Sequence, residues 1–109
     1  MATHHASPGE IVDFASWADD LPADKTKTIV KTDVMELARL VIPAGKEIPT
    51  HKVTGPLIVQ CVQGKIEFSA MGTTQALQCG QMLYLMPEEP YSFKGLEDAV
   101  VLLTILFIK

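Results

Sequence analysis

The sequence lacks the basic residues that several classes of binding protein require. One arginine, Arg39, is present, and the net charge over 109 residues is −4. A nucleic-acid-binding domain needs a basic face, and clamping several phosphates needs several guanidinium groups. We therefore expect no nucleic-acid partner and no site that clamps a chain of phosphates.

Cysteines, long apolar runs and a basic leader are scarce or missing as well. Two cysteines can build neither a disulfide framework nor the four-cysteine set of a structural zinc site. The longest uncharged apolar run, residues 99–108, has about half of the ~20 residues that a membrane-spanning helix needs. The N-terminus, MATHHASPGE, has no basic flank and no apolar stretch, so no signal peptide is predicted. These absences predict a cytoplasmic protein that has no membrane partner.

The chain does contain enough apolar residues for a core, and turn residues at regular intervals. Hydrophobic residues make up 48% and charged residues 20%, which is typical of a folded domain. Glycines recur at 45, 55, 64, 72 and 80, and this spacing is typical of short strands joined by turns. We predict one all-β domain of about nine or ten strands. The predicted strand segments include residues 27–32, 34–42, 57–63, 65–69, 73–78, 81–86 and 99–108.

Residues 1–24 differ from the rest of the chain, and we predict that they form an N-terminal arm in front of a barrel domain at 25–109. The arm has five acidic residues and no lysine or arginine. A short helical turn is predicted at 16–21, where a proline then ends it. The apolar residues of the arm, which include Phe14 and Trp17, must pack either on this barrel or on that of a partner.

Two spaced motifs in the predicted barrel are similar to those of the cupin family. The first family motif runs from a glycine through His, His and Glu to a second glycine, and the second motif contains glycine, proline, glycine, histidine and asparagine. The matching positions here are Gly45, His51, Val53, Leu57 and Gly64, and then Gly80, Met86, Glu88, Tyr91 and Gly95. The spacing is kept without gaps, and the resemblance covers residues 34–108. It implies the RmlC-like double-stranded β-helix, a single-domain jelly-roll barrel.

The positions that carry metal ligands in cupins have changed in this chain. Cupins use three histidines and a glutamate, which suit iron, manganese, nickel or zinc. Only His51 remains here, and the other three positions are occupied by Val53, Leu57 and Tyr91. One imidazole and one phenol fall short of the three protein ligands that a catalytic metal normally has. We therefore predict no metal and no other cofactor.

The inward positions of the family, extended by the alternation of side chains along each strand, predict the lining of the barrel interior. The predicted lining consists of His51, Val53, Leu57, Val59, Cys61, Met82, Tyr84, Met86 and Tyr91. Such a pocket is apolar, and an imidazole, a phenol and a thiol are its polar groups.

Three functions fit this pocket, and the sequence does not decide whether the protein is an enzyme. The preferred hypothesis is a barrel that binds a small apolar or weakly polar molecule without a metal. The first alternative is a metal-free epimerase or isomerase in which His51 is the base and Tyr91 the acid, as the resemblance to deoxysugar epimerases implies. The second is a metal-dependent dioxygenase or isomerase that combines His51 with atypical ligands such as Glu88 or Cys61.

Residues 99–108 also predict how the protein assembles. The run is apolar at successive positions, so both of its faces need cover. An outer strand of this kind, if left bare, would pair with other chains. Small cupins commonly dimerise through such strands, so we expect a homodimer.

Overall fold

The computed structural model describes residues 6–13 and 26–107, and within these ranges the protein has nine strands and no helix. The strands are β1 (Thr26–Lys31), β2 (Met35–Ile42), β3 (Glu47–His51), β4 (Leu57–Gln63), β5 (Lys65–Ala70), β6 (Thr73–Gln78), β7 (Met82–Leu85), β8 (Tyr91–Gly95) and β9 (Ala99–Leu106). The predicted all-β architecture is confirmed. The helical turn predicted at 16–21 lies outside the described residues, as do Phe14 and Trp17.

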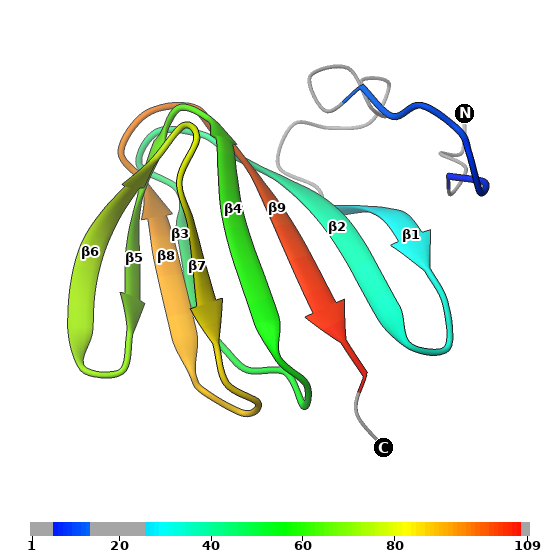
Figure 1. Cartoon of the computed structure of the whole chain (residues 1–109). Coiled ribbons are helices and arrows are strands. Elements are labelled where there is room, and N and C mark those ends of the chain that lie inside the picture. Colours follow the sequence, from blue (N-terminus) through cyan, green and yellow to red (C-terminus); the bar gives the residue numbers. More distant parts are fainter. Residues whose placement is uncertain (1–5, 14–25, 108–109) are drawn as a thin grey trace.

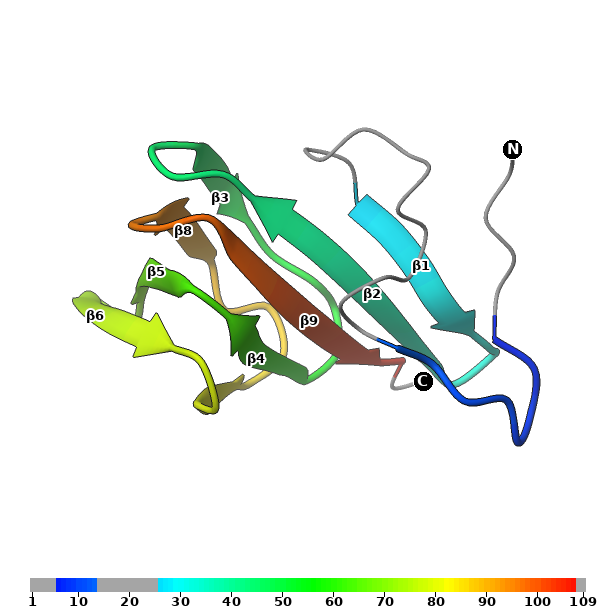
Figure 2. The same cartoon turned by 90° about the horizontal axis from the view of Figure 1, so that it is seen from above.

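The strands form two antiparallel sheets that face each other (Figure 1). One sheet has the order β1-β2-β9-β4-β7, and the other has the order β3-β8-β5-β6. The outermost strands β1 and β6 lie at opposite ends of the molecule, as the view from above also shows (Figure 2). Strands β3 and β8 were not among the predicted segments, because both are short and mix polar with apolar residues.

The core lies between the two sheets and takes one face of each contributing strand. In β4, Leu57, Val59 and Cys61 are buried, whereas Gln60 between them is exposed. This alternation follows from the strand backbone, which points successive side chains to opposite faces of the sheet.

Strand β9 is the middle strand of the five-stranded sheet, and the prediction of an outer strand was wrong. It pairs with β2 on one side and with β4 on the other, so none of its length is a free edge. Both of its faces are covered, as predicted. Val101 and Leu103 pack in the core between the sheets, whereas Leu102 packs on the opposite face with Ile29 and with apolar side chains of residues 6–13. The apolar run of β9 is therefore covered to a large extent within one chain.

Candidate functional site

A cavity of about 270 Å³ lies between the two sheets, beside the end of β3. Its walls are mostly apolar and include Ala38, Leu40, Ile48, Val53, Leu103 and Ile105. Three side chains bring ionisable or hydrogen-bonding groups to it: Glu36, His51 and Tyr91. Apolar walls with a few polar groups are typical of sites that bind small molecules.

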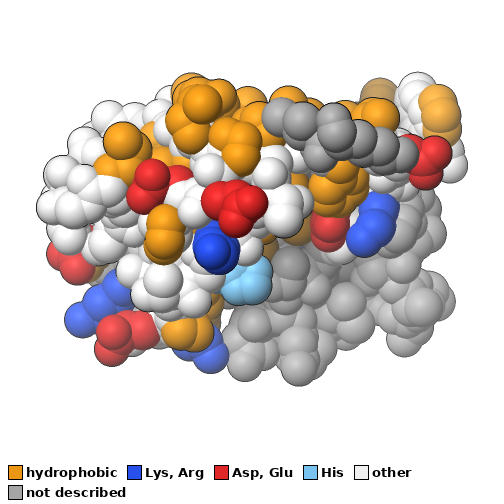
Figure 3. All heavy atoms as spheres, turned by 90° about the horizontal axis from the view of Figure 1, so that it is seen from below, with side chains coloured by type: hydrophobic (Ala, Val, Ile, Leu, Met, Phe, Trp, Pro, Cys, Tyr) orange, Lys and Arg blue, Asp and Glu red, His pale blue; other side chains and the backbone are white. Residues whose placement is uncertain are grey.

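His51 reaches the cavity from the last residue of β3. The register of β3 against β8 shifts just before it: Ile48 pairs with Phe93, but His51 pairs with Tyr91, so one extra residue bulges from β3. The strand ends there, and Val53 lies in the connection between β3 and β4. The His51 side chain is exposed, and Figure 3 shows a histidine in pale blue on the surface at this end of the molecule.

Tyr91 forms the inner wall of the cavity from β8 and is 4% exposed. Its ring stacks on Phe68, with ring centroids 5.9 Å apart, and on Phe93, with centroids 6.1 Å apart. Phe68 and Phe93 stack on each other as well, at 5.7 Å. These contacts fix the position of the phenol, because buried aromatic rings stabilise one another by the area they bury and by ring–ring contact.

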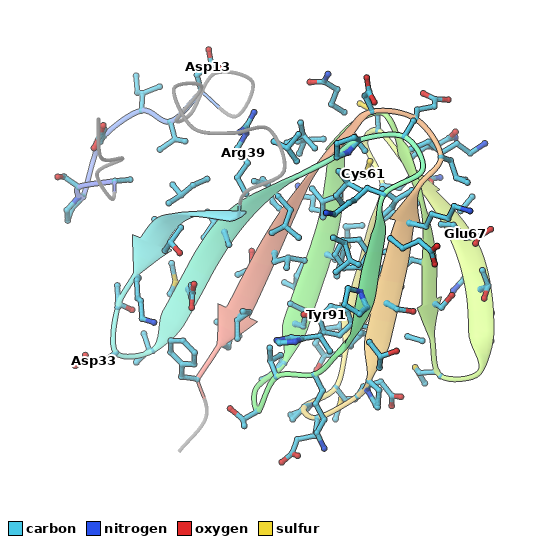
Figure 4. The ribbon with its side chains drawn as sticks, turned by 180° about the vertical axis from the view of Figure 1, so that it is seen from behind. Asp13, Asp33, Arg39, Cys61, Glu67 and Tyr91 are labelled. Atoms are coloured by element: carbon cyan, nitrogen blue, oxygen red, sulfur yellow. The ribbon has the colours of Figure 1, made fainter. Side chains whose placement is uncertain are left out.

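The hydroxyl of Tyr91 has no hydrogen-bond partner in the described part of the chain, although the residue is almost fully buried. Burial raises the pKa of this phenol above its usual value, because the phenolate would lose its hydration. The group is therefore a neutral donor at physiological pH. Figure 4 shows the Tyr91 side chain between the two sheets.

Glu36 is a member of this site that the sequence analysis missed. Its Oε2 accepts a hydrogen bond from the Thr28 hydroxyl at 3.1 Å, and its Oε1 lies 3.7 Å from Nζ of Lys31. The signal was present, because Glu36 is two and four residues before Ala38 and Leu40, and side chains at this spacing share the inward face of β2. The carboxylate lies at the end of the strand, where it can keep these polar partners.

Three predicted lining residues belong to the packed core instead. Leu57, Val59 and Cys61 are fully buried in the core cluster, but none of them borders the cavity. The interior around these residues of β4 is filled by neighbouring side chains, Ile66 among them. Cys61 is placed towards the loops at the other end of the barrel, away from Tyr91 (Figure 4).

The predicted phase of strand β7 was wrong. Met82, Tyr84 and Met86 face outward and are 50%, 54% and 61% exposed, whereas Leu83 and Leu85 pack towards the core. Both faces of this segment are apolar, so alternation alone could not say which face turns inward. The pairing of Leu85 with the buried Leu57 sets the phase.

The donors in the described residues do not fit the metal site that the fold family implies. No group of three or more histidine, cysteine or acidic side chains lies close enough together there to hold a metal ion. Val53 and Leu57 carry no donor atom, and Tyr91 is held in its aromatic stack. The residues described at these positions therefore do not form the metal site of the fold family.

Glu88, a candidate ligand in the metal-dependent alternative, lies in the turn between β7 and β8. Its side chain is exposed and its Oε1 is 3.8 Å from Nζ of Lys52. Its backbone has a φ of 65°, and its N–H donates to the Val53 carbonyl at 2.8 Å. The left-handed conformation explains why the corresponding position in the cupin motif is a glycine.

Arg39 lies away from the cavity. It is 4% exposed, and its neighbours Ala38 and Leu40 face the core, so alternation turns Arg39 to the opposite side of the sheet. That is the side on which residues 6–13 lie (Figure 4). The arginine is therefore not placed to meet a ligand in the cavity.

A larger hollow of about 420 Å³ lies beside the hairpin between β5 and β6. Hydroxyl groups border it, and two of these, on Ser69 and Thr74, already bond to each other at 2.9 Å. Tyr91 borders this hollow as well, but more of its lining side chains are polar than in the cavity between the sheets, so it is the weaker candidate for a ligand site.

A two-sheet jelly roll with a site between its sheets defines a class of small barrel proteins, and comparison with solved structures identifies the fold as that of the cupins. A cupin superfamily protein from Desulfitobacterium hafniense matches with a TM-score of 0.81 at 11% identity, over 99% of this chain and 100% of its own. An RmlC-like cupin protein from Desulfovibrio desulfuricans matches with a TM-score of 0.70 at 23% identity, over 97% and 96% of the two chains. A conserved protein of unknown function from Streptococcus pyogenes matches with a TM-score of 0.78 at 17% identity, over 100% and 96%.

The protein is therefore a small domain with the RmlC-like cupin fold, as the spacing of its motifs predicted. No family model and no curated protein matches the sequence. In the ranges that the structure describes, no helix has the length and apolar character needed to cross a membrane.

Proposed function

We propose that the protein binds a small neutral molecule, with an apolar body and one hydrogen-bond acceptor, in the cavity between its sheets, and that binding needs no metal. The observation that carries this proposal is Tyr91, a buried residue that borders the cavity and whose hydroxyl has no partner in the described residues. A buried donor without a partner costs about 1–3 kcal/mol. A ligand that accepts this hydrogen bond would recover much of that free energy.

The size and charge of the cavity narrow the class of ligand. Its volume of about 270 Å³ is slightly below the ~300 Å³ at which pockets for drug-sized molecules begin. Glu36 brings a carboxylate to the same cavity, which disfavours an anionic ligand. A carbonyl or hydroxyl group on a small aromatic or aliphatic body satisfies both conditions.

Tyr91→Phe tests this proposal directly, because it removes the hydroxyl and keeps the ring. A panel of small neutral ketones, amides and alcohols is screened by ligand-observed NMR, and the dissociation constants of the hits are measured. We expect Tyr91→Phe to weaken binding about tenfold, as the loss of one buried hydrogen bond implies.

The chain offers a matched control in its second tyrosine. Tyr84 is exposed on the outer face, where its hydroxyl donates to Sδ of Met86 at 3.3 Å. Tyr84→Phe should leave the dissociation constants unchanged. Hits that bind Tyr91→Phe as tightly as the parent would show that the hydroxyl does not select the ligand.

A second candidate function uses the same groups as a metal-free acid and base. His51 and Tyr91 approach each other from adjacent strands, with ring centroids 6.1 Å apart, and the raised pKa of Tyr91 keeps its proton in place for donation. In such an epimerase or isomerase, His51 removes a proton from carbon and Tyr91 supplies one. Exchange of ligand C–H hydrogens for deuterium in D₂O, lost in His51→Ala, would distinguish this function from binding alone.

We also propose that the protein is a homodimer. The support is the apolar outer face of the edge strand β7, where Met82 and Tyr84 are half exposed in a single chain, as is Met86 directly after the strand. Isolated apolar residues are common on protein surfaces, but three at alternate positions along a sheet edge form a continuous stripe.

A further inference from the structure

The two cysteines of the chain, 18 positions apart in sequence, lie opposite each other in the fold. Cys61 is in β4, and Cys79 is in the turn between β6 and β7. The N–H of Cys61 donates to the carbonyl of Gln81 at 2.9 Å, and the N–H of Gly80 donates to the carbonyl of Cys61 at 2.9 Å. The residue that follows Cys79 is therefore hydrogen-bonded directly to Cys61.

The two thiols also converge on the same short stretch of backbone. Sγ of Cys79 donates to the carbonyl of Val62 at 3.3 Å, and Sγ of Cys61 donates to the carbonyls of Gln63 at 3.4 Å and Gly64 at 3.5 Å. The Gly64 carbonyl also accepts the N–H of Cys79 at 3.1 Å. One oxygen atom thus lies within hydrogen-bonding distance of both cysteines.

The two cysteines differ in their access to solvent. Both are free thiols, but Cys79 is exposed and Cys61 is fully buried. Burial raises the pKa of Cys61 above its ordinary value, and the charge of a nearby Cys79 thiolate raises it further. Cys79 is therefore the thiol that a reagent from solvent meets first, whereas Cys61 is shielded from solvent.

We propose that Cys61 and Cys79 are a reversible dithiol–disulfide pair, with Cys79 as the thiol that reacts first and Cys61 as the thiol that resolves the product. This assignment is independent of the ligand cavity, which neither residue borders. The two cysteines lie on neighbouring segments that are joined by backbone hydrogen bonds, as a disulfide between them requires.

The reaction balances with a peroxide as the oxidant. The Cys79 thiolate attacks one oxygen of hydrogen peroxide, the O–O bond breaks, and a sulfenic acid and one water form. The Cys61 thiolate then attacks Sγ of Cys79, the S–O bond breaks, and hydroxide leaves and becomes a second water. Two electrons pass from the two sulfur atoms to the peroxide. A low-molecular-weight disulfide such as oxidised glutathione gives the same bond by two successive exchanges, and a dithiol reductant reverses it.

The disulfide would close a loop that contains β5 and β6 and would tie the turn before β7 to β4. A cross-link that the native fold already favours restricts mainly the unfolded chain, so it stabilises the folded state. By linkage, the disulfide must then be more stable in the folded protein than in the unfolded chain. The stability of the disulfide in the folded and in the unfolded chain can therefore be compared directly, and this test does not depend on any known activity.

The experiment equilibrates the full chain with reduced and oxidised glutathione at several ratios, once in native buffer and once in urea. The reaction is quenched with acid, the remaining thiols are alkylated, and mass spectrometry gives the disulfide fraction and the linked peptides. We expect the equilibrium constant for the Cys61–Cys79 bond to be at least about tenfold larger in native buffer than in urea. The oxidised protein should also melt at least about 5 °C above the reduced protein.

Single-thiol variants are the controls for this experiment. Cys79→Ser replaces an exposed residue, so it should fold like the parent and show no change in melting temperature under oxidation. Cys61→Ser should keep glutathione on Cys79 as a stable mixed disulfide, because the resolving thiol is gone. If this buried substitution unfolds the protein, the parent and Cys79→Ser still decide the question.

Three outcomes would overturn the proposal. The first is an equilibrium constant in native buffer that is no larger than in urea. The second is a folded parent in which Cys79 keeps glutathione although Cys61 is present. The third is a disulfide between two chains through Cys79 at micromolar protein concentration, with Cys61 still reduced.

Discussion

The ring of His51 meets the ring of Tyr91 edge-on at the cavity, with centroids 6.1 Å apart and planes at 77°. The bulge in β3 creates this contact, because the extra residue shifts the register so that His51 lies directly opposite Tyr91. In the cupin motifs both positions are histidines that share a metal. Here the second position is a tyrosine whose ring belongs to an aromatic stack, so the pair forms a cavity wall.

Replacing Tyr91 separates the contribution of its ring from that of its hydroxyl. Tyr91→Phe should raise the free energy of unfolding by about 1–3 kcal/mol, because it removes a buried donor that has no partner in the described fold. Tyr91→Ala should lower it by about 3–5 kcal/mol, because the stacked ring leaves a cavity in the core. Urea unfolding measures both. A loss of about 1 kcal/mol or more in Tyr91→Phe would instead reveal a partner for the hydroxyl.

The raised pKa of Tyr91 predicts a loss of stability at alkaline pH. The folded protein holds this proton more tightly than the unfolded chain. The resulting contribution to the free energy of unfolding is fully present below about pH 10, where unfolded tyrosine titrates. It is lost as the pH rises from there through the folded-state pKa. Melting temperatures measured from pH 8 to 11.5 (about 2 units below and 1.5 units above that value) should fall more steeply for the parent than for Tyr91→Phe. Cys61 titrates in both proteins, so its effect cancels in the comparison.

Glycine at position 88 should stabilise the fold. Glu88 has a φ of 65°, a conformation that costs a residue with a side chain about 1 kcal/mol and costs glycine nothing. The ion pair with Lys52 is exposed on both sides, so its loss changes little. We expect Glu88→Gly to raise the free energy of unfolding by about 0.5–1 kcal/mol.

Glu89→Gly is the matched control for that substitution. It removes the same charge from the same turn, but Glu89 is not among the residues with positive φ. Glycine there only makes the unfolded chain more flexible, so stability should fall. Equal effects of the two substitutions in urea unfolding would contradict the role assigned to the backbone at position 88.

Chelators and metal ions should leave the stability of the protein almost unchanged. A metal at about a hundred times its Kd would add ~2.7 kcal/mol of stability. For a domain of this size each kcal/mol shifts the melting temperature by roughly 4–8 °C, so binding could not be missed. We expect shifts below about 2 °C with zinc, nickel, iron or manganese. Stoichiometric metal in the purified protein that is lost in His51→Ala would instead favour the metal-dependent alternative.

Sedimentation velocity tests the proposed homodimer and the face that forms it. The parent should sediment as a dimer at micromolar concentration. Tyr84→Lys places a charge at the centre of the exposed stripe on β7 and should shift the protein towards the monomer. Thr73→Lys, at an exposed position of β6 in the other sheet, is the control. A parent that is monomeric at these concentrations contradicts the proposal.

Several features of the protein were predictable from the sequence, because they depend on neighbouring residues or on fixed spacing. Turn glycines divided most of the chain into its strands, and the two spaced motifs predicted the fold that the solved structures confirm. The replacement of metal ligands by Val53 and Leu57 was equally visible, because each position is fixed by its distance from a motif glycine. Short strands of mixed polarity, β3 and β8, escaped this kind of reasoning.

Only the tertiary structure decided which residues meet. Alternation divides a strand into two faces, but the pairing of Leu85 with Leu57 chose the inward face of β7. The packing around Tyr91 left its hydroxyl without a partner in the described chain, although the sequence shows only a tyrosine in a ligand position. Backbone hydrogen bonds between β4 and the turn before β7 bring Cys79 close to Cys61. No local sequence pattern connects these two parts of the chain.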